Sequence, residues 1–337
     1  MPIDLSPLDK HHDLLFEVPL KVRQGHRFQP TGFPDLGAAE FDTPEGRSLL
    51  VESAQSMANR LEAVCWDEST NDLVESLRGL SYVKVLREGR YLTSSLTDSH
   101  RLNSPYILES KDKTFFTVLQ GELGALEKGP IDRKVLAQKL LKYDVGSLVH
   151  GVFLAKLAGG RLRSARALTA FVEADGVKVA PSGGSKQDHV DPSGKAFGQG
   201  GAEKGFGHVP FPRDEYTADK ITLYASVDLA QIRGYGLDAD ASKLLILLAL
   251  FKLRLLLDSP MRLRTACCFE LQDRGDIVSK NIAKFTLPNG EAFIGEKGED
   301  GKWSGELPAL IAKLAIVGET DATDTVKMRV TEVTFTS

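Results

Sequence analysis

The chain has 337 residues, of which 42% are hydrophobic and 26% are charged, a balance that is typical of globular proteins and excludes an intrinsically disordered or fibrous chain. A formal net charge of −4 excludes a nucleic-acid-binding protein that is basic throughout. The three cysteines form no C-x-x-C spacing, and two of them are adjacent, so neither a zinc site nor a disulfide framework is predicted.

The first half of the chain predicts a strand, a long loop and two helices. Residues 14–23 are typical of a strand, and the Gly- and Pro-containing segment 24–47 indicates a loop. One apolar stripe predicts a helix over 48–64. A further helix is predicted over 132–143, beginning near Asp132.

The second half is organised around a segment unlike the rest. Residues 166–180 predict a hairpin that turns at Asp175-Gly176. The 33 residues of 181–213 hold eight glycines and four prolines, which indicates an extended flexible arm. The remaining predictions are strands over 220–233, 262–271 and 326–335 and a buried helix over 241–258 with Asp240 as its N-cap. This order predicts an α+β fold, an antiparallel sheet with helices on one face.

Charge is distributed unevenly. Residues 288–324 hold eight acidic residues and three lysines, so the rest of the chain is close to +1. A basic face can therefore exist beside an acidic one. The beginning of the chain lacks the apolar core of a signal peptide, and the longest apolar run, Leu244–Phe251, is too short for a membrane span, which predicts a cytoplasmic protein.

Enzyme signatures are missing from the sequence. It contains no P-loop, no nucleophile elbow, no H-E-x-x-H and no complete G-x-G-x-x-G. The group Asp188, His189, Asp191 and His208 could hold a divalent metal, but a solvated loop is favoured because a metal site needs rigid support. No catalytic residue, metal or cofactor is predicted.

Basic residues gather in short groups that suit RNA. Lys21, Arg23, His26 and Arg27 lie at the end of the first strand and in the loop after it, and Arg161, Arg163 and Arg166 follow a Gly-Gly pair. Each group alone is more often an ordinary solvated face, and together they favour a phosphate track only modestly. In the arm, phenylalanines alternate with lysines, which suits stacking on unpaired bases as well as local packing within a loop.

Two joined motifs carry a family resemblance. RFQPTGFPDLGAAEF (residues 27–41), followed by LVESAQSMANRLEAVCWD (50–67), closely resembles the Cas-seven-type backbone subunit, of the RAMP superfamily, of type I-U (I-G) CRISPR Cascade effector complexes. The resemblance implies an RRM-like (ferredoxin-like) palm within a single domain over 1–337, a fingers-like insertion over 66–130 and a thumb-like arm over 181–216. It also implies several copies in a helical filament on a crRNA, which pairs with target DNA, together with the large and the crRNA-processing subunits.

The resemblance implies roles for individual residues. It implies RNA-backbone contacts by Arg27, Arg47, Ser53, Gln55, Asn59 and Arg60, and the basic groups named above add Lys21, Arg23, His26, Arg161, Arg163 and Arg166 as candidate RNA-binding residues. Residues that wedge between bases would be Lys195, Phe197, Lys204, Phe206 and Val209 on the arm.

Two other functions stay open. Related subunits of type III effectors cut RNA with an aspartate in the loop after the first strand, and Asp35 and Asp42 lie in that loop here. A metal-dependent ribonuclease is therefore the alternative. A self-assembling scaffold without nucleic acid is the third hypothesis.

Overall fold

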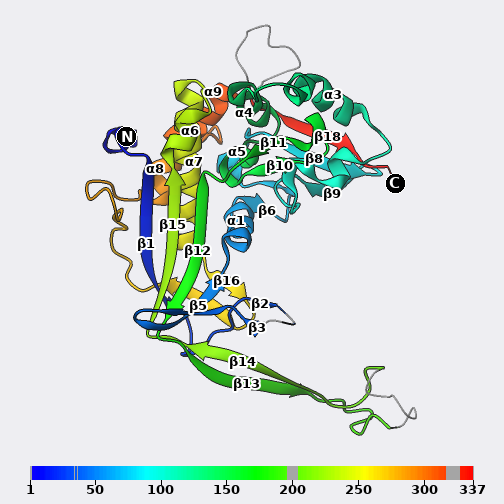
Figure 1. The fold of residues 1–337 in the computed structure, drawn as a ribbon, viewed down its shortest axis with the longest axis vertical. Coiled ribbons are helices and arrows are strands. Elements are labelled where there is room, and N and C mark those ends of the chain that lie inside the picture. Colours follow the sequence, from blue (N-terminus) through cyan, green and yellow to red (C-terminus); the bar gives the residue numbers. More distant parts are fainter. Residues whose placement is uncertain (1, 34, 36, 196–203, 316–326, 337) are drawn as a thin grey trace.

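A seven-stranded sheet forms the centre of the molecule. The computed structural model of the chain describes residues 2–33, 35, 37–195, 204–315 and 327–336. Every neighbouring pair of strands in the sheet is antiparallel. The order is β16 (Met261–Arg264), β17 (Cys267–Leu271), β1 (Asp13–Val22), β15 (Lys220–Asp228), β12 (Leu168–Asp175), β5 (Gly46–Glu52) and β4 (Glu40–Thr43). The predicted α+β class with an antiparallel sheet is confirmed (Figure 1).

Two helices connect the central strands and cover the sheet. Helix α1 (Ala54–Ala63) lies between β1 and β12 in the chain, and α7 (Ala239–Asp258) lies between β15 and β17. The helices contact each other; α1 also contacts β12, and α7 contacts β15. Alternate residues of β1, Leu14, Phe16, Val18 and Leu20, are buried, as expected of a strand with one face in a core.

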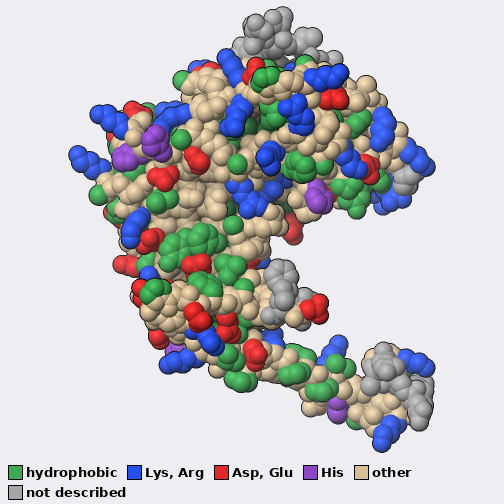
Figure 2. All heavy atoms as spheres, viewed as in Figure 1, with side chains coloured by type: hydrophobic (Ala, Val, Ile, Leu, Met, Phe, Trp, Pro, Cys, Tyr) green, Lys and Arg blue, Asp and Glu red, His purple; other side chains and the backbone are tan. Residues whose placement is uncertain are grey.

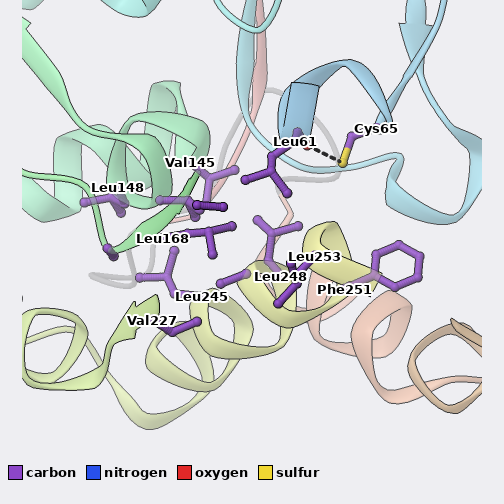
Figure 3. Close-up of a cluster of buried hydrophobic side chains, with 14 of the residues drawn as sticks. Leu61, Cys65, Val145, Leu148, Leu168, Val227, Leu245, Leu248, Phe251 and Leu253 are labelled. Atoms are coloured by element: carbon purple, nitrogen blue, oxygen red, sulfur yellow. Dashed lines mark hydrogen bonds between the residues drawn. The ribbon is translucent and has the colours of Figure 1, made fainter. Parts of the chain in front are cut away.

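The core joins the sheet to a second lobe, which is formed by residues 66–166 and the last strand. Leu61 and Cys65 at the end of α1, Val145 and Leu148 of the second lobe and Leu248 of α7 belong to one buried cluster (Figure 3). Helix α7 is apolar nearly all round because it is buried on several sides, as predicted. Its N-cap is Asp238, not Asp240, since the Asp238 carboxylate accepts a hydrogen bond from the Ala241 amide.

The second lobe contains residues 66–166 and the last strand (Figure 1, upper right). Its helices are α2 (Pro105–Leu108), α3 (Thr114–Leu123), α4 (Arg133–Tyr143) and α5 (Val145–His150). Its strands are β6 (Trp66–Asp67), β7 (Asp72–Leu73), β8 (Tyr82–Arg87), β9 (Arg90–Ser94), β10 (Val152–Leu154), β11 (Leu162–Ser164) and β18 (Val330–Thr334). The predicted helix 132–143, with Asp132 as its N-cap, is confirmed.

The closing strand does not join the central sheet. Strand β18 pairs in parallel with β8 in a three-stranded sheet of the second lobe. Position 326 of the predicted strand lies outside the described residues. The alternation of apolar residues identified a strand but could not identify its partner, because pairing depends on distant parts of the chain.

The arm is a β-ribbon. Strands β13 (Lys178–Lys186) and β14 (Val209–Thr217) pair antiparallel over their whole length and project away from the sheet (Figure 1). The prediction of a flexible segment over 181–216 is therefore wrong for both strands. Twelve glycine and proline residues within 181–213 concealed the ribbon, because these residue types ordinarily oppose strand formation. Gly183 and Gly184 lie where the two strands approach closely: a Cβ on Gly183 would lie 2.8 Å from the Phe211 carbonyl oxygen, and a Cβ on Gly184 would lie 3.1 Å from the Phe211 ring.

Several boundaries differ from prediction. Residues 46–52 form β5, so the helix predicted over 48–64 begins only at Ala54. The loop predicted over 24–47 contains β2 (Gly32–Phe33), β3 (Gly37–Ala38) and β4. Strand β12 pairs with β15 and β5 rather than with β13, so the hairpin at Asp175-Gly176 is not formed.

The chain after the central strands contributes short helices and one further hairpin. The strand predicted over 220–233 ends at Asp228, where α6 (Leu229–Gly234) begins. The segment 262–271 forms two strands, β16 and β17, in place of one. Helices α8 (Gly290–Ile294) and α9 (Glu306–Leu314) follow. Among the described residues, no helix has the length and apolar character needed to cross a membrane.

Candidate nucleic-acid interface

Of three adjoining hollows, two lie where α1 meets the second lobe, and the third lies between α4, β11 and α6. The first, about 290 Å³, is lined by residues that include Asn59, and it shares Ser99 with the second, about 360 Å³. The second shares Ser164 and Ala165 with the third, about 650 Å³. We call the three together the trough, and the second the middle hollow.

The trough brings together four of the predicted RNA-binding residues. Asn59 lines the first hollow, Gln55 and Arg166 line the middle one, and Arg163 lines the third. Two of them are in direct contact, since the Arg166 guanidinium donates a hydrogen bond to the Gln55 side-chain oxygen. Two sequence segments more than one hundred residues apart thus meet on one surface.

Charge changes sign along the trough. The residues that line the first hollow include Glu62, Glu68 and Asp98 and no Lys or Arg. Those of the middle hollow include Arg101 and Arg166 and no Asp or Glu. A phosphate backbone is therefore favoured at the middle hollow and disfavoured at the first. Figure 2 shows a wide concavity between the second lobe and the arm, with Lys and Arg side chains on its upper wall.

A buried ion pair between Arg101 and Glu62 lies at the middle hollow, which Arg101 lines. Arg101 and Glu62 are only 6% and 4% exposed, and the guanidinium donates two hydrogen bonds to the carboxylate, of 2.9 and 2.7 Å. Burial raises the pKa of Glu62, and the hydrogen bonds from Arg101 oppose that change. Arg101 also has a φ of 50°, a costly conformation for a non-glycine residue that the surrounding contacts must maintain.

A second buried polar contact joins α7 to the trough. The Nζ atom of Lys252 lies 3.0 Å from Nε2 of His150, and both residues are almost fully buried. Burial, together with the Lys252 charge, holds the pKa of His150 well below its usual value, so the imidazole is neutral. Because an ammonium group can only donate, Nε2 accepts the hydrogen bond and the imidazole proton is on Nδ1.

Asp144, beside this cluster, gives a pH prediction. Burial raises the pKa of its carboxyl to about 7, although Ser147 donates a hydrogen bond to it. The folded state therefore retains a proton that the unfolded state has lost between about pH 4 and pH 7, so this group lowers stability as pH rises through that window. We expect Asp144→Asn to gain stability relative to the parent by roughly 1 kcal/mol per pH unit in this range. Urea unfolding of both proteins from pH 4.5 to 7.5 checks this, and parallel pH profiles would contradict it.

The remaining predicted residues on α1 have partners within the chain. Arg60 donates to the buried Glu52 carboxylate at 3.1 Å and also to the Leu263 carbonyl. The Ser53 hydroxyl oxygen caps α1 by accepting a hydrogen bond from the Ser56 amide. Arg60 thus holds α1 against β5 and β16, and Ser53 caps the helix, so we leave both out of the interface proposed below.

The predicted RNA-binding residues Lys21, Arg23 and His26 lie near the foot of the arm, outside the trough. Lys21 and His26 line one hollow there with Lys178, and Arg23 lines another. Lys21 forms an ion pair of 3.2 Å with Glu270. These residues are not brought together with Gln55 and Arg166 at a single hollow.

Three further predicted arginines contact acidic side chains or carbonyl groups. Arg27 lies 3.6 Å from Glu215 at the base of the arm, and Arg47 lies 3.2 Å from Glu40. Arg161 donates two hydrogen bonds to the carbonyl groups of residues 127 and 129. Arg27 and Arg47 keep more than half of their side-chain surface exposed and can still meet a phosphate.

The described part of the arm tip is organised by one carboxylate. Asp188 accepts hydrogen bonds from the amides of Val190, Asp191 and Gly207, and these bonds lower its pKa. Of the predicted wedge residues, Val209 is exposed in β14, Lys195 and Lys204 are exposed near the tip, and Phe206 is half-buried. Phe197 lies outside the described residues.

Removing the Asp188 carboxylate should loosen the tip without unfolding the protein. Asp188→Ala leaves three backbone amides without their acceptor, so we expect protease cleavage within 187–208 to accelerate about tenfold while the melting temperature stays unchanged. Limited proteolysis with fragment mass analysis checks this. Asp214→Ala, on the same arm but outside the tip, is the control, and equal cleavage rates in both variants would contradict the prediction.

Metal-binding geometry is not seen in the described part of the chain. No group of three or more His, Cys, Asp or Glu side chains there could hold a metal ion. Asp42 is strongly exposed and lies 3.8 Å from Arg47, and Asp35 is also exposed. The Asp188 carboxylate accepts hydrogen bonds from backbone amides, so its role is structural.

Sequence reasoning missed several residues of the middle hollow. His100, Arg101, Asn103, His150 and Phe153 all line it, yet none was predicted. Residues 71–130 had no clear periodicity, and His150 and Phe153 lie in an apolar stretch that resembles core. Only Phe153 could have been singled out, because strand alternation in β10 places it on the exposed face, between the buried Val152 and Leu154.

Comparison with known proteins identifies the class of the chain. Residues 14–179, which include most of β1, all of β5, α1 and β12, and the trough residues of the second lobe, match the family model described as CRISPR-associated protein GSU0053. Over these residues the chain is similar to a family of CRISPR-associated proteins, and this match confirms the resemblance found at residues 27–67. No curated protein matches the sequence.

Solved structures also match, at low similarity. A chain titled "CRISPR RNA-guided surveillance complex, pre-nicking" is 14% identical with a TM-score of 0.37, and the match covers 77% of this chain and 76% of that one. A chain titled "CRISPR RNA-guided surveillance complex" is 14% identical with a TM-score of 0.33, covering 73% and 60%. Csc2 of Thermofilum pendens is 10% identical with a TM-score of 0.30, covering 79% and 67%. Likenesses at this level support no residue-by-residue inference.

Proposed function

We propose that the chain is a crRNA-binding backbone subunit of a CRISPR surveillance complex, in which several copies coat the guide and present its bases for pairing with target DNA. The observation that carries the proposal is the trough, where Gln55 of α1 and Arg166 of the second lobe meet in a hollow without acidic lining residues. The match of residues 14–179 to a family model of CRISPR-associated proteins supports it. The partners would be crRNA, further copies of the chain and the other Cascade subunits, in the cytoplasm.

The architecture supports an RRM-like palm. Strands β17, β1, β15 and β12 lie side by side in that order, and the chain passes β1, α1, β12, β15, α7, β17. This is the βαββαβ succession of a ferredoxin-like unit. The second lobe would then correspond to the fingers, which extend beyond residues 66–130, and the ribbon β13–β14 to the thumb.

Purification with RNA tests the proposal. The subunit expressed together with its complex should retain RNA of defined length, and nuclease treatment should change the assembly state. Binding to the phosphate backbone should also weaken steeply with salt. A preparation that keeps its assembly state after nuclease treatment and contains no RNA would contradict the proposal and favour a scaffold.

Metal-dependent cleavage of RNA is the alternative function, and a second measurement tests it. Labelled RNA incubated with stoichiometric protein and magnesium or manganese should remain intact, because the exposed Asp35 and Asp42 belong to no metal-binding group within the described residues. RNA cleavage that is lost in Asp35→Asn or Asp42→Asn would establish the ribonuclease function.

A further inference from the structure

The central sheet has one face that α1 and α7 leave uncovered. The two helices pack on the face that holds Val172 and Leu223, which belong to the buried core. Successive residues of a strand point to opposite faces, so Phe171 of β12 and Tyr224 of β15 lie on the other face. Both are only half-buried. Figure 2 shows hydrophobic side chains gathered over the middle of these two strands. We call this side of β1, β15 and β12 the open face.

A stacked aromatic pair occupies the middle of the open face. Phe171 and Tyr224 are directly opposite each other in the pairing register, and their ring centroids lie 5.2 Å apart with an angle of 21° between the ring planes. Glu17 of β1 is opposite Tyr224, and Glu173 follows Phe171 on the same face of β12. The two rings therefore form an apolar surface with a carboxylate on either side. The face of an aromatic ring attracts cations.

Acidic side chains outnumber basic ones on the open face. The registers place on it five acidic residues and two lysines: Asp13, Glu17, Glu173, Asp175, Asp228, Lys21 and Lys220. Both lysines lie at the end next to the arm, where they line the same hollow as Lys178. The part of the open face around the aromatic pair is thus acidic.

One of the two carboxylates beside the rings has no cationic partner. Glu17 pairs with Lys280 of a neighbouring loop at 3.0 Å, whereas Glu173 forms no ion pair with any described residue. Burial, together with the nearby charge of Asp175, raises the pKa of Glu173. A cation placed over the rings would compensate both effects. A phosphate backbone would be repelled there, and the trough residues Gln55 and Asn59 belong to α1, on the covered side of the sheet.

We propose that the open face docks a second protein of the complex, through a segment that presents an arginine or lysine side chain between apolar residues. The cation lies over Phe171 and Tyr224 and pairs with Glu173, while its apolar neighbours cover Leu15 and Pro19. Arginine suits the site best, because a guanidinium can stack on a ring and donate hydrogen bonds to a carboxylate at the same time. Aromatic residues are enriched at the centres of protein interfaces. The inference rests on the proposed function, which supplies the complex, and adds to it the surface where a subunit other than this chain binds.

Photo-crosslinking in the assembled complex tests the docking face. Benzoylphenylalanine replaces the exposed Pro19 in the full chain, which is co-expressed with the other subunits and the guide, and mass spectrometry identifies the attached segment. We expect one segment of a different subunit, with Arg or Lys within a few residues of the crosslink. Glu17→Lys combined with Glu173→Lys should lower the yield about tenfold, because both side chains then repel the cation. Phe171→Leu, which removes the ring and keeps an apolar side chain, should lower it about threefold.

A charge-matched double variant is the control. Glu296→Lys combined with Glu299→Lys changes the net charge by the same amount, and both residues are exposed beside Lys297, which pairs with Glu75 of the second lobe. The crosslink yield should equal that of the parent. Equal yields in the two double variants would mean that the partner responds to overall charge and would overturn the docking face.

The remaining outcomes separate the docking face from the proposed function. Crosslinks to the guide, to another copy of this chain or to nothing overturn the docking face, and the guide-coating function stands if the complex still retains its RNA. The expected protein crosslink in a complex without RNA overturns the guide-coating function and leaves the docking face standing. A chain that assembles with neither RNA nor protein overturns both.

Discussion

Reversing the charge of Arg166 should weaken RNA binding about tenfold to a hundredfold at physiological salt. The residue lines the one hollow of the trough that has cationic and no acidic lining residues, so Arg166→Glu replaces attraction for a phosphate by repulsion. The loss should be similar for guides of different sequence, because phosphates carry no sequence information. Titration of labelled RNA at several salt concentrations measures it, and the slope of log affinity against log salt should become shallower.

Lys280→Glu provides the matched control. Lys280 is 59% exposed, forms an ion pair of 3.0 Å with Glu17 and lies outside the trough, and its replacement changes the net charge by the same amount. Equal losses in the two variants would mean that RNA responds to overall charge and not to the trough. Melting temperatures of both variants should match the parent, since Arg166 is only partly buried.

Replacing Arg101 with Met should cost about 3–5 kcal/mol of unfolding free energy. The substitution leaves the Glu62 carboxylate buried without the guanidinium that donates two hydrogen bonds to it. The loss should be smaller near pH 5 than at pH 8, because burial raises the pKa of Glu62 and the unpaired group can take up a proton. Urea unfolding at both pH values measures it.

A double variant separates the unpaired charge from lost packing. Glu62→Gln combined with Arg101→Met removes the buried charge, so it should recover part of the stability lost in the single variant and abolish the pH dependence. A single variant that loses less than about 1 kcal/mol would show that water reaches the pair in solution.

The sequence predicted the central elements more reliably than their pairing. Strand β1 and helices α4 and α7 were found because each has a periodic apolar face. Strand β5 was mistaken for the start of a helix, since its apolar residues are continuous with those of α1 and a buried strand has no alternation to reveal it. The partners of β12 and β18 were missed because both pair with distant segments.

The candidate site followed the same pattern. Gln55 and Asn59 were proposed from a family resemblance and Arg163 and Arg166 from a group of basic residues, and all four line the trough. The groups that give the middle hollow its character, such as His150 and Asn103, could not be found from sequence, because a buried polar residue has no local pattern. Arg60 shows the converse: a cation on an apparently solvated helix face is held by a buried glutamate from the preceding strand.

The arm has a consequence for solubility. A two-stranded ribbon has two open edges, and open edges invite other chains to add as further strands. Pro181, Pro210 and Pro212 occupy every second position of the pairing register, opposite Asp214, Ser185 and Gly183. A proline has no amide hydrogen, so the backbone donors that would face outward at these positions are missing from both edges. The residues that concealed the ribbon in the sequence thus protect the free subunit from edge-to-edge aggregation.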